Sequence, residues 1–461
     1  MQPIFNFLKR ILGKNFTKKI RPLGHGIKAY LASLYYGFPG KKMILIGITG
    51  TKGKTTATVL TGKMFNLLGN KAGYISSALI FDGENEILNP FKMGTIDSVK
   101  MQKYLKEMLK NGCQYAVLEM TSLGLEQNRH LGLGKFHSTV FLNIYPEHIE
   151  AHGSWENYLA AKGILFENVK AGGNFITIYN QDQQKNADFM TSRIPESITN
   201  SVNKLQIKTA DFEILNYEFK LEKILKINSQ IFPTNFISEV EVIDLYFAIK
   251  TIENYVPEIF TKLESILPKL YGIPGRMEWV VRAGEIVNNE KLKIKNTSNC
   301  ISILVDYAHE PESMRKLLQT LKDWQKQDFF TKVIHILSCD GAGRDDWKKP
   351  VMGDLSWQYA DYTILTTDNY EACDNPEEIL KLLATNYDKS KVNQKYFTEI
   401  NRLKSFQNAL ELEKQLSLLN PKEKVLIVST GVGTEAGLTQ PTGKIKWDER
   451  EVWREVYSDK M

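Results

Sequence analysis

Short apolar runs alternate along the chain with stretches in which apolar residues recur at helical spacing. In the first half, the pattern predicts buried strands at residues 43–48, 115–118, 139–142 and 175–179. It predicts helices from residue 55 onward and over residues 98–110 and 154–167. Strands that alternate with helices of this length form parallel sheets, because a parallel pair needs a long crossover connection. The first half therefore predicts an α/β unit.

The same alternation returns after a less regular segment. Residues 184–232 are polar with mixed β character, residues 239–255 predict a helix, and the polar residues 284–300 predict a hairpin. Further strands are predicted at residues 301–305, 333–337, 362–366 and 424–429, with helices between them. We predict an α/β chain with three parts: a short N-terminal segment (1–42), a central domain (43–285) and a C-terminal domain (298–461).

A glycine-rich turn, Thr49-Gly-Thr-Lys-Gly-Lys-Thr-Thr56, joins the first predicted strand to the first predicted helix. Glycines let backbone N–H groups curl around phosphate oxygens, and the helix N-terminus adds partial positive charge. Lys54 can reach the β- and γ-phosphates, and the Thr55 hydroxyl can bind Mg²⁺. The spacing departs from the common phosphate-binding loop, because Ile48 stands at its first glycine position. We predict that ATP is bound by Gly50, Thr51, Lys52, Gly53, Lys54, Thr55 and Thr56.

Other side chains of possible chemical use follow the loop. Glu119 ends the strand predicted at residues 115–118, and an acid at the carboxyl end of a neighbouring strand can coordinate Mg²⁺. His148 and His152 are four residues apart, but a catalytic H-E-x-x-H pattern and an obvious third ligand are absent from the sequence, so we do not expect zinc. Lys162 by itself would be read as a solvated helix residue.

Composition favours an intracellular enzyme. The 461 residues are 43% hydrophobic, which is enough for two or three separate cores. No apolar run reaches the roughly 20 residues of a membrane span, and the first residues do not resemble a signal peptide. Cys113, Cys300, Cys339 and Cys373 are far apart and form no C-x-x-C pair. We therefore expect reduced thiols and a cytoplasmic protein.

The net charge of +6 conceals an asymmetry. Residues 1–42 contain nine Lys and Arg and no acid, which leaves 50 basic and 53 acidic residues elsewhere, a net charge of −3. Apolar residues at helical spacing between Ile4 and Leu12 make a short basic amphipathic stretch. It predicts either a helix packed on the central domain or contact with an anionic membrane surface or phosphorylated substrate. We do not expect nucleic-acid binding, because aromatic residues are not interleaved with the basic ones elsewhere.

Ten short motifs follow one another between residues 43 and 455. Together, and in this order, they closely resemble the motifs of the Mur ligase family of ATP-dependent amide-forming enzymes. The motifs are Thr49 to Thr56, Glu119-Met-Thr-Ser122, Asn143 with Glu147-His148, Tyr158-x-x-Ala-Lys162, Asn180-Gln-Asp182, Gly275-Arg-Met-Glu278, Asp306-Tyr-Ala-His309-x-Pro311, Gly343-Arg-Asp345, Thr367-Asp-Asn369 and Gly431-Val-Gly-Thr-Glu435. The resemblance implies a P-loop central domain and a Rossmann-like C-terminal domain. Within the family it is strongest to ligases that extend UDP-N-acetylmuramoyl-L-alanyl-D-glutamate by one amino acid.

The resemblance also implies roles for individual residues. Lys54, Lys162, His148 and Arg276 would be catalytic, with Thr55, Glu119, His148 and Lys162 at Mg²⁺. Lys162 matches a lysine that is carbamylated in the family, and as a carbamate it would present a carboxylate-like group to the metal. The nucleotide would be contacted by Asn180, Asp182, Arg276, Asp306 and His309. The acceptor would be contacted by Thr95, Ser122 and Arg129, and the incoming amino acid by Arg344, Asp368, Asn369, Glu371, Gly431 and Glu435.

The implied reaction is phosphoryl transfer to a substrate carboxylate, followed by attack of an amino acid's amine on the acyl phosphate. We expect a monomer that acts on small molecules. Two departures from the family leave the acceptor and amino acid open. Only 42 residues precede the first strand, where the family has a domain for the UDP group, so a lipid-linked muropeptide, a folate or a polyamino acid remains an alternative acceptor. The family's D-N-P-R motif for diaminopimelate reads Asp368-Asn-Tyr-Glu371, which favours a cationic side chain such as lysine or ornithine.

Several conspicuous residues are read as structural. We expect Trp347, Trp357, Trp447 and Trp453 to pack in the second α/β unit, and His335 to be a hydrogen-bonded core residue within its strand. Residues 447–455 predict an amphipathic helix whose charges face solvent. From a different class, a nucleotide-dependent regulator that does not ligate is the remaining alternative, and the joint presence of Lys162, Glu119 and Arg276 argues against it.

Overall fold

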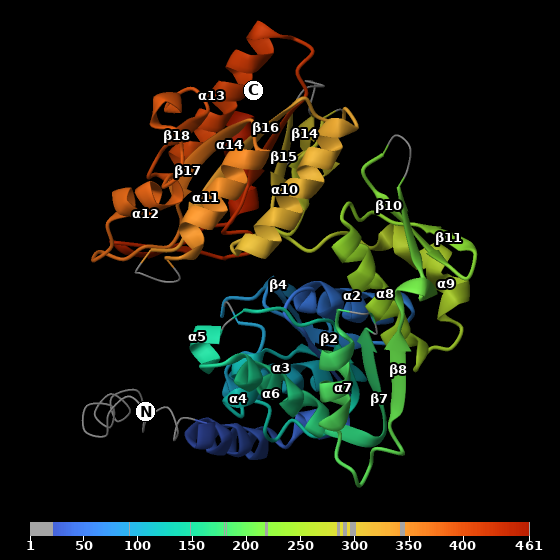
Figure 1. Ribbon diagram of the computed structural model, residues 1–461. Coiled ribbons are helices and arrows are strands. Elements are labelled where there is room, and N and C mark those ends of the chain that lie inside the picture. Colours follow the sequence, from blue (N-terminus) through green and yellow to red (C-terminus); the bar gives the residue numbers. More distant parts are fainter. Residues whose placement is uncertain are drawn as a thin grey trace. The chain divides into compact units, whose positions relative to one another are not determined.

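The chain forms two compact units, residues 1–271 and 272–461 (Figure 1). The computed structural model describes residues 22–91, 93–147, 149–178, 180, 182–216, 220–283, 286–288, 293–295, 301–341 and 346–460. The division falls before the residue 285 at which the predicted central domain ends. The reason is strand β12 (Glu278–Val281), which pairs with a strand of the second unit.

The first unit is built on an eight-stranded sheet with the order β4-β3-β2-β5-β1-β6-β7-β8. The strands are β1 (Ile44–Thr49), β2 (Ala72–Ile75), β3 (Leu79–Phe81), β4 (Glu86–Leu88), β5 (Tyr115–Glu119), β6 (Phe136–Phe141), β7 (Val169–Ile178) and β8 (Asn203–Ile207). The strands from β2 to β8 in this order are mutually parallel, and β3 and β4 extend the edge in antiparallel fashion. The parallel strands therefore end at one common edge.

Helices cover both faces of this sheet. On one face, α2 (Lys54–Leu67) packs against β5 and against α8 (Glu239–Glu253). On the other face, α3 (Ser98–Lys110) and α6 (Trp155–Glu167) contribute Met101, Leu105, Leu165 and Phe166 to one apolar cluster with Leu45. This sandwich holds the loop between β1 and α2 on a rigid frame.

Smaller elements complete the unit. The remaining helices are a helix over residues 22–36, η1 (Pro39–Lys42), α4 (Ser122–Glu126), α5 (Ile149–His152), α7 (Gln184–Ser192), η2 (Thr209–Asp211), α9 (Ile259–Ile266) and η3 (Leu267–Lys269). A separate antiparallel sheet has the order β11-β10-β9, with β9 (Glu213–Asn216), β10 (Lys223–Ile227) and β11 (Gln230–Pro233). The mixed β character predicted for residues 184–232 corresponds to this sheet, together with β8 and the helix α7.

The second unit has a six-stranded sheet with the order β12-β15-β19-β16-β17-β18. Its other strands are β15 (Ile301–Val305), β16 (Lys332–Cys339), β17 (Tyr362–Thr367), β18 (Tyr396–Thr398) and β19 (Val425–Ser429), and all except β12 run parallel. Its helices are α10 (Pro311–Lys326), α11 (Lys348–Tyr359), α12 (Pro376–Leu383), η4 (Lys389–Lys391), α13 (Arg402–Leu419) and α14 (Glu449–Lys460). Figure 1 shows α10 and α11 over one face of this sheet. Two short hairpins are β13 (Ile286–Asn288) with β14 (Lys293–Lys295), and β20 (Leu438–Gln440) with β21 (Gly443–Ile445).

The predicted α/β class is confirmed, and the predicted strands and the hairpin coincide with observed elements within a few residues. Two structural expectations are wrong. The charges of residues 447–455 do not all face solvent, because Glu449 is fully buried and pairs with Arg402 of α13. Trp347 is 61% exposed and does not pack in the core, whereas Trp447 and Trp453 do. His335 is confirmed as a buried, hydrogen-bonded core residue, with partners Ser356 and Thr430.

Candidate active site

The phosphate-binding loop lies at the carboxyl end of β1, between β5 and β6. The Asn143 side chain fixes part of the loop backbone, because its amide oxygen accepts from the N–H groups of Thr51 (3.2 Å) and Lys52 (3.0 Å). Lys54 begins α2, and its ammonium donates to the Thr51 carbonyl at 2.8 Å. Gly53 has φ 83°, a conformation that L side chains rarely adopt, and a Cβ there would lie 2.2 Å from Asp244 Oδ1. The loop is therefore a tight cradle that excludes side chains.

Two side-chain oxygens that can bind a metal ion, those of Thr55 and Glu119, lie close together beside the loop. The Thr55 hydroxyl donates to Glu119 Oε2 at 3.1 Å, and the Ser77 N–H donates to the same oxygen at 2.7 Å. Both Thr55 and Glu119 are buried. A hydroxyl and a carboxylate are the ligands that Mg²⁺ prefers, so this pair fits a metal ion at the phosphates.

Lys162 is fully enclosed within the same region. It projects from α6, only 1% of its surface is exposed, and its Nζ donates to the Gly50 carbonyl of the loop at 2.7 Å. Burial, and then the nearby Lys54 ammonium, lowers the pKa of Lys162 well below that of an ordinary lysine. A neutral amine is the nucleophilic form of lysine, so this residue is chemically unlike a surface lysine.

Thr95, Ser122 and Arg129 lie around the end of β5. The Thr95 hydroxyl donates to the Glu119 carbonyl at 3.0 Å, and Arg129 donates to the Thr95 carbonyl at 2.9 Å. The Ser122 hydroxyl is 3.0 Å from Nε2 of the buried His152. Hydrogen bonds thus connect Thr95 to both Glu119 and Arg129 at this end of β5.

In the second unit, candidate residues follow the carboxyl ends of β15, β16, β17 and β19. Asp306 accepts from the N–H groups of Met277 (2.8 Å) and Ala308 (2.7 Å), while burial raises the pKa of its carboxyl group. The Arg276 guanidinium lies 5.0 Å from the centre of the Tyr307 ring, and the His309 ring lies 4.6 Å from it. Arg276, Asp306 and His309 therefore form one cluster, and their contact with a nucleotide stays a prediction.

A second cluster in this unit is acidic. The Asn369 amide group donates to Asp340 Oδ1 (3.2 Å) and to Glu435 Oε2 (3.1 Å). Asp368 is buried and accepts from Ser338 at 2.9 Å; burial, and then Asp340, raises the pKa of Asp368. A Cβ on Gly431 would lie 2.4 Å from Ser338 Oγ, so only glycine leaves room for the Ser338 side chain. The cluster offers carboxylate and amide oxygens to a cationic amine.

Other predicted residues lie apart or outside the described residues. Glu371 is exposed, and its N–H donates to Asp374. Asn180 accepts from the Gln183 N–H, and Asp182 is exposed. His148 and Arg344 lie outside the described residues, so the structure says nothing of their roles. Among the residues that are described, no group of three or more His, Cys, Asp and Glu side chains is placed to hold a metal.

Sequence reasoning missed residues that shape the loop. Ser77 bonds both Thr55, at 2.7 Å, and Glu119. Asp244 lies against Gly53, and Asn143 anchors the loop backbone. Asn143 follows the strand predicted at residues 139–142 and stands in one of the motifs, which was the available signal, although no role was predicted for it. Ser77 follows β2, where no strand was predicted, so no local pattern marked it. Asp244 lies inside α8, where no local pattern marks it.

The chain is similar in sequence to known proteins over most of its length. Residues 48–249 match the Mur ligase middle domain, and residues 291–431 match the Mur ligase, glutamate ligase domain. The chain is 30% identical over 454 residues to the UDP-N-acetylmuramoyl-L-alanyl-D-glutamate–2,6-diaminopimelate ligase of Clostridioides difficile, covering 93% of this chain and 82% of that protein. It is 28% identical over 438 residues to the enzyme of the same name from Chlamydia caviae, covering 94% and 82%.

Solved structures share the fold. A structure of a UDP-N-acetylmuramoyl-L-alanyl-D-glutamate–2,6-diaminopimelate ligase aligns with a TM-score of 0.56 at 22% identity, covering 91% of this chain and 79% of that one. The folylpolyglutamate synthase of Mycobacterium tuberculosis, solved with ADP and AMPPCP, aligns with a TM-score of 0.67 at 14% identity, covering 89% and 93%. At these identities the structural likeness concerns the fold alone.

Proposed function

The chain belongs to the Mur ligase family, and we propose that it is an ATP-dependent ligase that joins an amino acid to a UDP-N-acetylmuramoyl-L-alanyl-D-glutamate-type acceptor in cytoplasmic peptidoglycan precursor synthesis. The observation that carries this proposal is the enclosed lysine of the phosphate loop. Lys162 bonds the Gly50 carbonyl while Thr55 and Glu119 meet beside it. A protein that only bound ATP would have no use for a buried amine in this position.

The first step is attack of the acceptor carboxylate on the γ-phosphorus of ATP, which forms an acyl phosphate and releases ADP. Lys54 and the loop N–H groups hold the phosphate oxygens, and Thr55 with Glu119 would hold Mg²⁺. When bound, the metal neutralises charge that develops on the phosphoryl oxygens. Because Asn143 fixes the loop backbone, these donors need little reorganisation during the reaction.

We propose that Lys162 acts as its carbamate. The neutral amine, favoured by the lowered pKa, attacks the carbon of CO₂; an N–C bond forms while one C–O π bond opens and leaves its electron pair on oxygen, and the nitrogen releases a proton to water. The product is an anion at a place where an ammonium would lie beside Lys54 and a metal. ¹³C NMR with labelled bicarbonate tests this: a carbamate signal is expected from the wild-type protein and not from Lys162→Arg, and equal spectra would contradict it.

The second unit supplies the contacts for the incoming amino acid. Asp340, Glu435 and Asn369 form the cluster that would receive a cationic group, and the absence of a side chain at Gly431 lets Ser338 and Asp368 lie against the backbone. Since Glu371 stands where the family has an arginine, and is exposed, we propose that the added amino acid has a cationic side chain. In the first unit, Thr95, Ser122 and Arg129 would contact the acceptor.

The helix over residues 22–36 supports contact with an anionic membrane surface. Its large apolar side chains Leu23, Ile27, Leu31 and Leu34 follow helical spacing and are 55–64% exposed. The basic residues of the segment 1–42 supply the charge that anionic lipids attract. No helix in the described part of the chain is long and apolar enough to cross a bilayer. We propose a monomer that binds the surface reversibly.

Vesicle flotation tests this surface. Wild-type protein should float with phosphatidylglycerol vesicles, and the double variant Leu31→Glu, Leu34→Glu should not. The control Leu419→Glu changes an 85% exposed leucine of the second unit and should float normally. Loss of a dimer in the double variant, without any flotation of the wild type, would instead identify the stripe as a subunit contact.

The ligase itself is tested by phosphate release. The protein is incubated with Mg-ATP and UDP-N-acetylmuramoyl-L-alanyl-D-glutamate, and with diaminopimelate, L-lysine or L-ornithine in turn. Release that needs both substrates, favours lysine or ornithine and disappears in Lys162→Ala is the expected result. Preference for diaminopimelate would contradict the proposed specificity, and silence with all three would contradict the proposed acceptor.

A further inference from the structure

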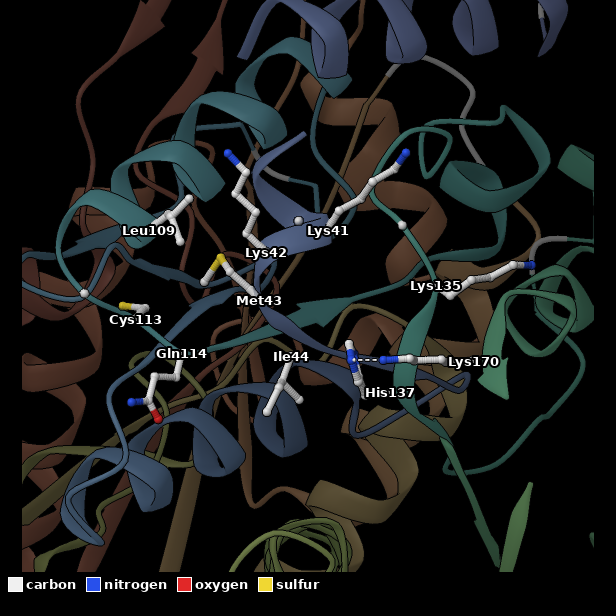
Figure 2. A pocket seen from close by; sticks show the side chains of 13 residues that line it. Lys41, Lys42, Met43, Ile44, Leu109, Cys113, Gln114, Lys135, His137 and Lys170 are labelled. Carbon is white, nitrogen blue, oxygen red and sulfur yellow. Dashed lines mark hydrogen bonds between the residues drawn. The ribbon is translucent and has the colours of Figure 1, made fainter. Parts of the chain in front are cut away.

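A cavity of about 810 Å³ opens at the amino-terminal edge of the first unit's sheet, at the edge opposite the phosphate loop. Its lining residues lie at or just before the starts of β1, β5, β6 and β7, in η1 and at the end of α3. They include Lys41, Lys42, Lys135, Lys170 and His137, and none is Asp or Glu. We call this cavity the N-edge pocket. Figure 2 shows these side chains around it.

His137 and Lys170 face each other across part of the pocket. The Leu45 N–H donates to His137 Nδ1 at 3.2 Å, which fixes Nδ1 as an acceptor. The proton of the neutral ring is therefore on Nε2, and Nε2 lies 3.1 Å from Lys170 Nζ, as the dashed line in Figure 2 shows. Burial, and then the Lys170 charge, lowers the pKa of His137, which keeps the ring neutral.

With the ring in this tautomer, the His137 Nε2–H and the Lys170 ammonium are both donors, so neither accepts from the other. Neither the Nε2–H of His137 nor the Lys170 ammonium has a carbonyl or carboxylate partner among the described residues. An oxygen with two free lone pairs, placed between them, would accept from both. The arrangement matches what an anion requires, and a neutral ligand would leave the lysine charge unbalanced.

The other lysines have ammonium N–H groups without a hydrogen-bond partner among the described residues. Lys42 is exposed and has no partner in the described part of the chain, and the Lys41 ammonium lies 4.2 Å from the centre of the Phe38 ring. Lys135 donates to the Glu167 carbonyl at 3.0 Å and to Asn168 Oδ1 at 3.5 Å, which leaves one of its three ammonium N–H groups. The pocket thus gathers four positive charges with no acid among its lining residues.

We propose that the N-edge pocket binds a phosphoryl-bearing ligand, one of whose oxygens accepts from both His137 Nε2 and Lys170 Nζ. Lys41, Lys42 and Lys135 balance the remaining negative charge, and Met43 with Leu109 forms an apolar wall for the organic part. The six residues of β1 span about 20 Å, so the pocket and the ATP site take separate ligands. The proposal is independent of the ligase function.

A titration with inorganic pyrophosphate tests the pocket. The full-length protein is labelled with ¹⁵N, its ATP site is saturated with Mg-AMPPNP, and the imidazole nitrogens of His137 are observed by NMR. A saturable shift of Nε2 is expected in the wild type. Lys170→Gln should weaken the affinity by about tenfold or more, whereas Lys100→Gln, an exposed lysine of α3 in the same unit, should leave it unchanged.

The source of the phosphoryl group is separated by a second arm. Phosphatidylglycerol vesicles replace pyrophosphate, and binding is measured by flotation of the wild type and of Lys170→Gln. A Lys170-dependent response to pyrophosphate identifies a soluble ligand, and one to vesicles alone identifies a lipid headgroup; both support the pocket. No saturable shift and no Lys170-dependent flotation, or equal effects of Lys170→Gln and Lys100→Gln, would overturn the proposal.

Discussion

Lys162 is a residue whose burial we expect to lower the stability of the fold and whose presence we attribute to function. Its amine is completely buried and donates a hydrogen bond to the Gly50 carbonyl. Desolvation disfavours the ammonium, and the fold must then hold a neutral amine or a modified one. Functional sites commonly carry such groups because chemistry requires them.

The variant Lys162→Met should therefore be more stable than the wild type while it loses ligase activity. In CO₂-free buffer at pH 7 we expect its free energy of unfolding to rise by about 1–3 kcal/mol, measured by urea denaturation. Because the folded pKa of Lys162 is lowered, the folded wild type binds fewer protons than the unfolded chain, and its stability should rise with pH up to about 10.4. The variant should lack this increment. A less stable variant would show that the amine is a structural donor.

Asp368 has the opposite pH dependence. Burial and the neighbouring Asp340 raise its folded pKa, so the folded protein holds a proton that the unfolded chain has released. Stability should therefore fall as pH rises from about 4 toward the folded pKa. Asp368→Asn should remove this fall, visible as a smaller difference between urea midpoints at pH 5 and pH 8. An unchanged difference would show that Asp368 is ionised throughout.

At the residue scale, sequence identifies groups more readily than environments. Lys54, Thr55 and Glu119 carry a motif or a strand end that marks them, and the structure brings them together. For Lys162 the burial follows from α6 packing against the loop, which sequence spacing alone does not show. Asp244 and Ser77 reach the site through tertiary packing, so no local pattern marks their contribution.

At the element scale, the turn between β1 and α2 depends on one glycine. Gly53 has φ 83°, and a Cβ there would meet Asp244 Oδ1 at 2.2 Å. Gly69 has the same φ of 83°, but nothing lies within 4 Å of its added Cβ. The two glycines thus have the same φ, and they differ in the space that an added Cβ would have.

This pair gives a matched test of the cradle. Gly53→Ala should abolish ATP binding in calorimetry, because the carbon displaces Asp244 or the loop. Gly69→Ala should cost only about 1 kcal/mol of stability and keep ATP affinity. Retained ATP binding in Gly53→Ala would mean that the loop adapts and that its shape is not decisive.

Helix α14 is fastened by a buried ion pair. Glu449 accepts from Arg402 of α13 and from the Trp447 indole, and neither charged group is more than 4% exposed. Glu449→Ala leaves the guanidinium buried without its partner, so we expect a loss of about 3–5 kcal/mol in the urea denaturation of the second unit. Glu455→Ala, an exposed glutamate on the same helix, should change little. Equal losses would contradict the role of the pair.

Element periodicity predicted most of the sheet strands, because parallel strands buried on both faces are continuous apolar runs. It was wrong about residues 447–455 for a physical reason. Charged residues usually mark a solvated face, but Glu449 is compensated by Arg402, some 47 residues earlier in the chain. Pairing at that separation is not visible in helical spacing.

At the scale of the whole molecule, the two units divide the chemistry. The first unit holds the phosphate loop, the enclosed lysine and the residues proposed to contact the acceptor, and the second holds the acidic cluster. Sequence predicted two α/β units, but the division after Tyr271 depends on β12, a short strand that joins the second sheet in antiparallel fashion. Short edge strands have little periodicity, so the boundary could not be read from the pattern.

The central claim is that a substrate carboxylate, and not water, attacks the γ-phosphate. The most direct measurement uses acceptor whose reacting carboxylate carries ¹⁸O, with Mg-ATP and the preferred amino acid. Phosphate formed through an acyl phosphate keeps one carboxylate oxygen, so mass spectrometry should find one ¹⁸O in the released phosphate for each amide formed. Phosphate without ¹⁸O, released at the same rate, would mean that ATP is simply hydrolysed and would contradict the account.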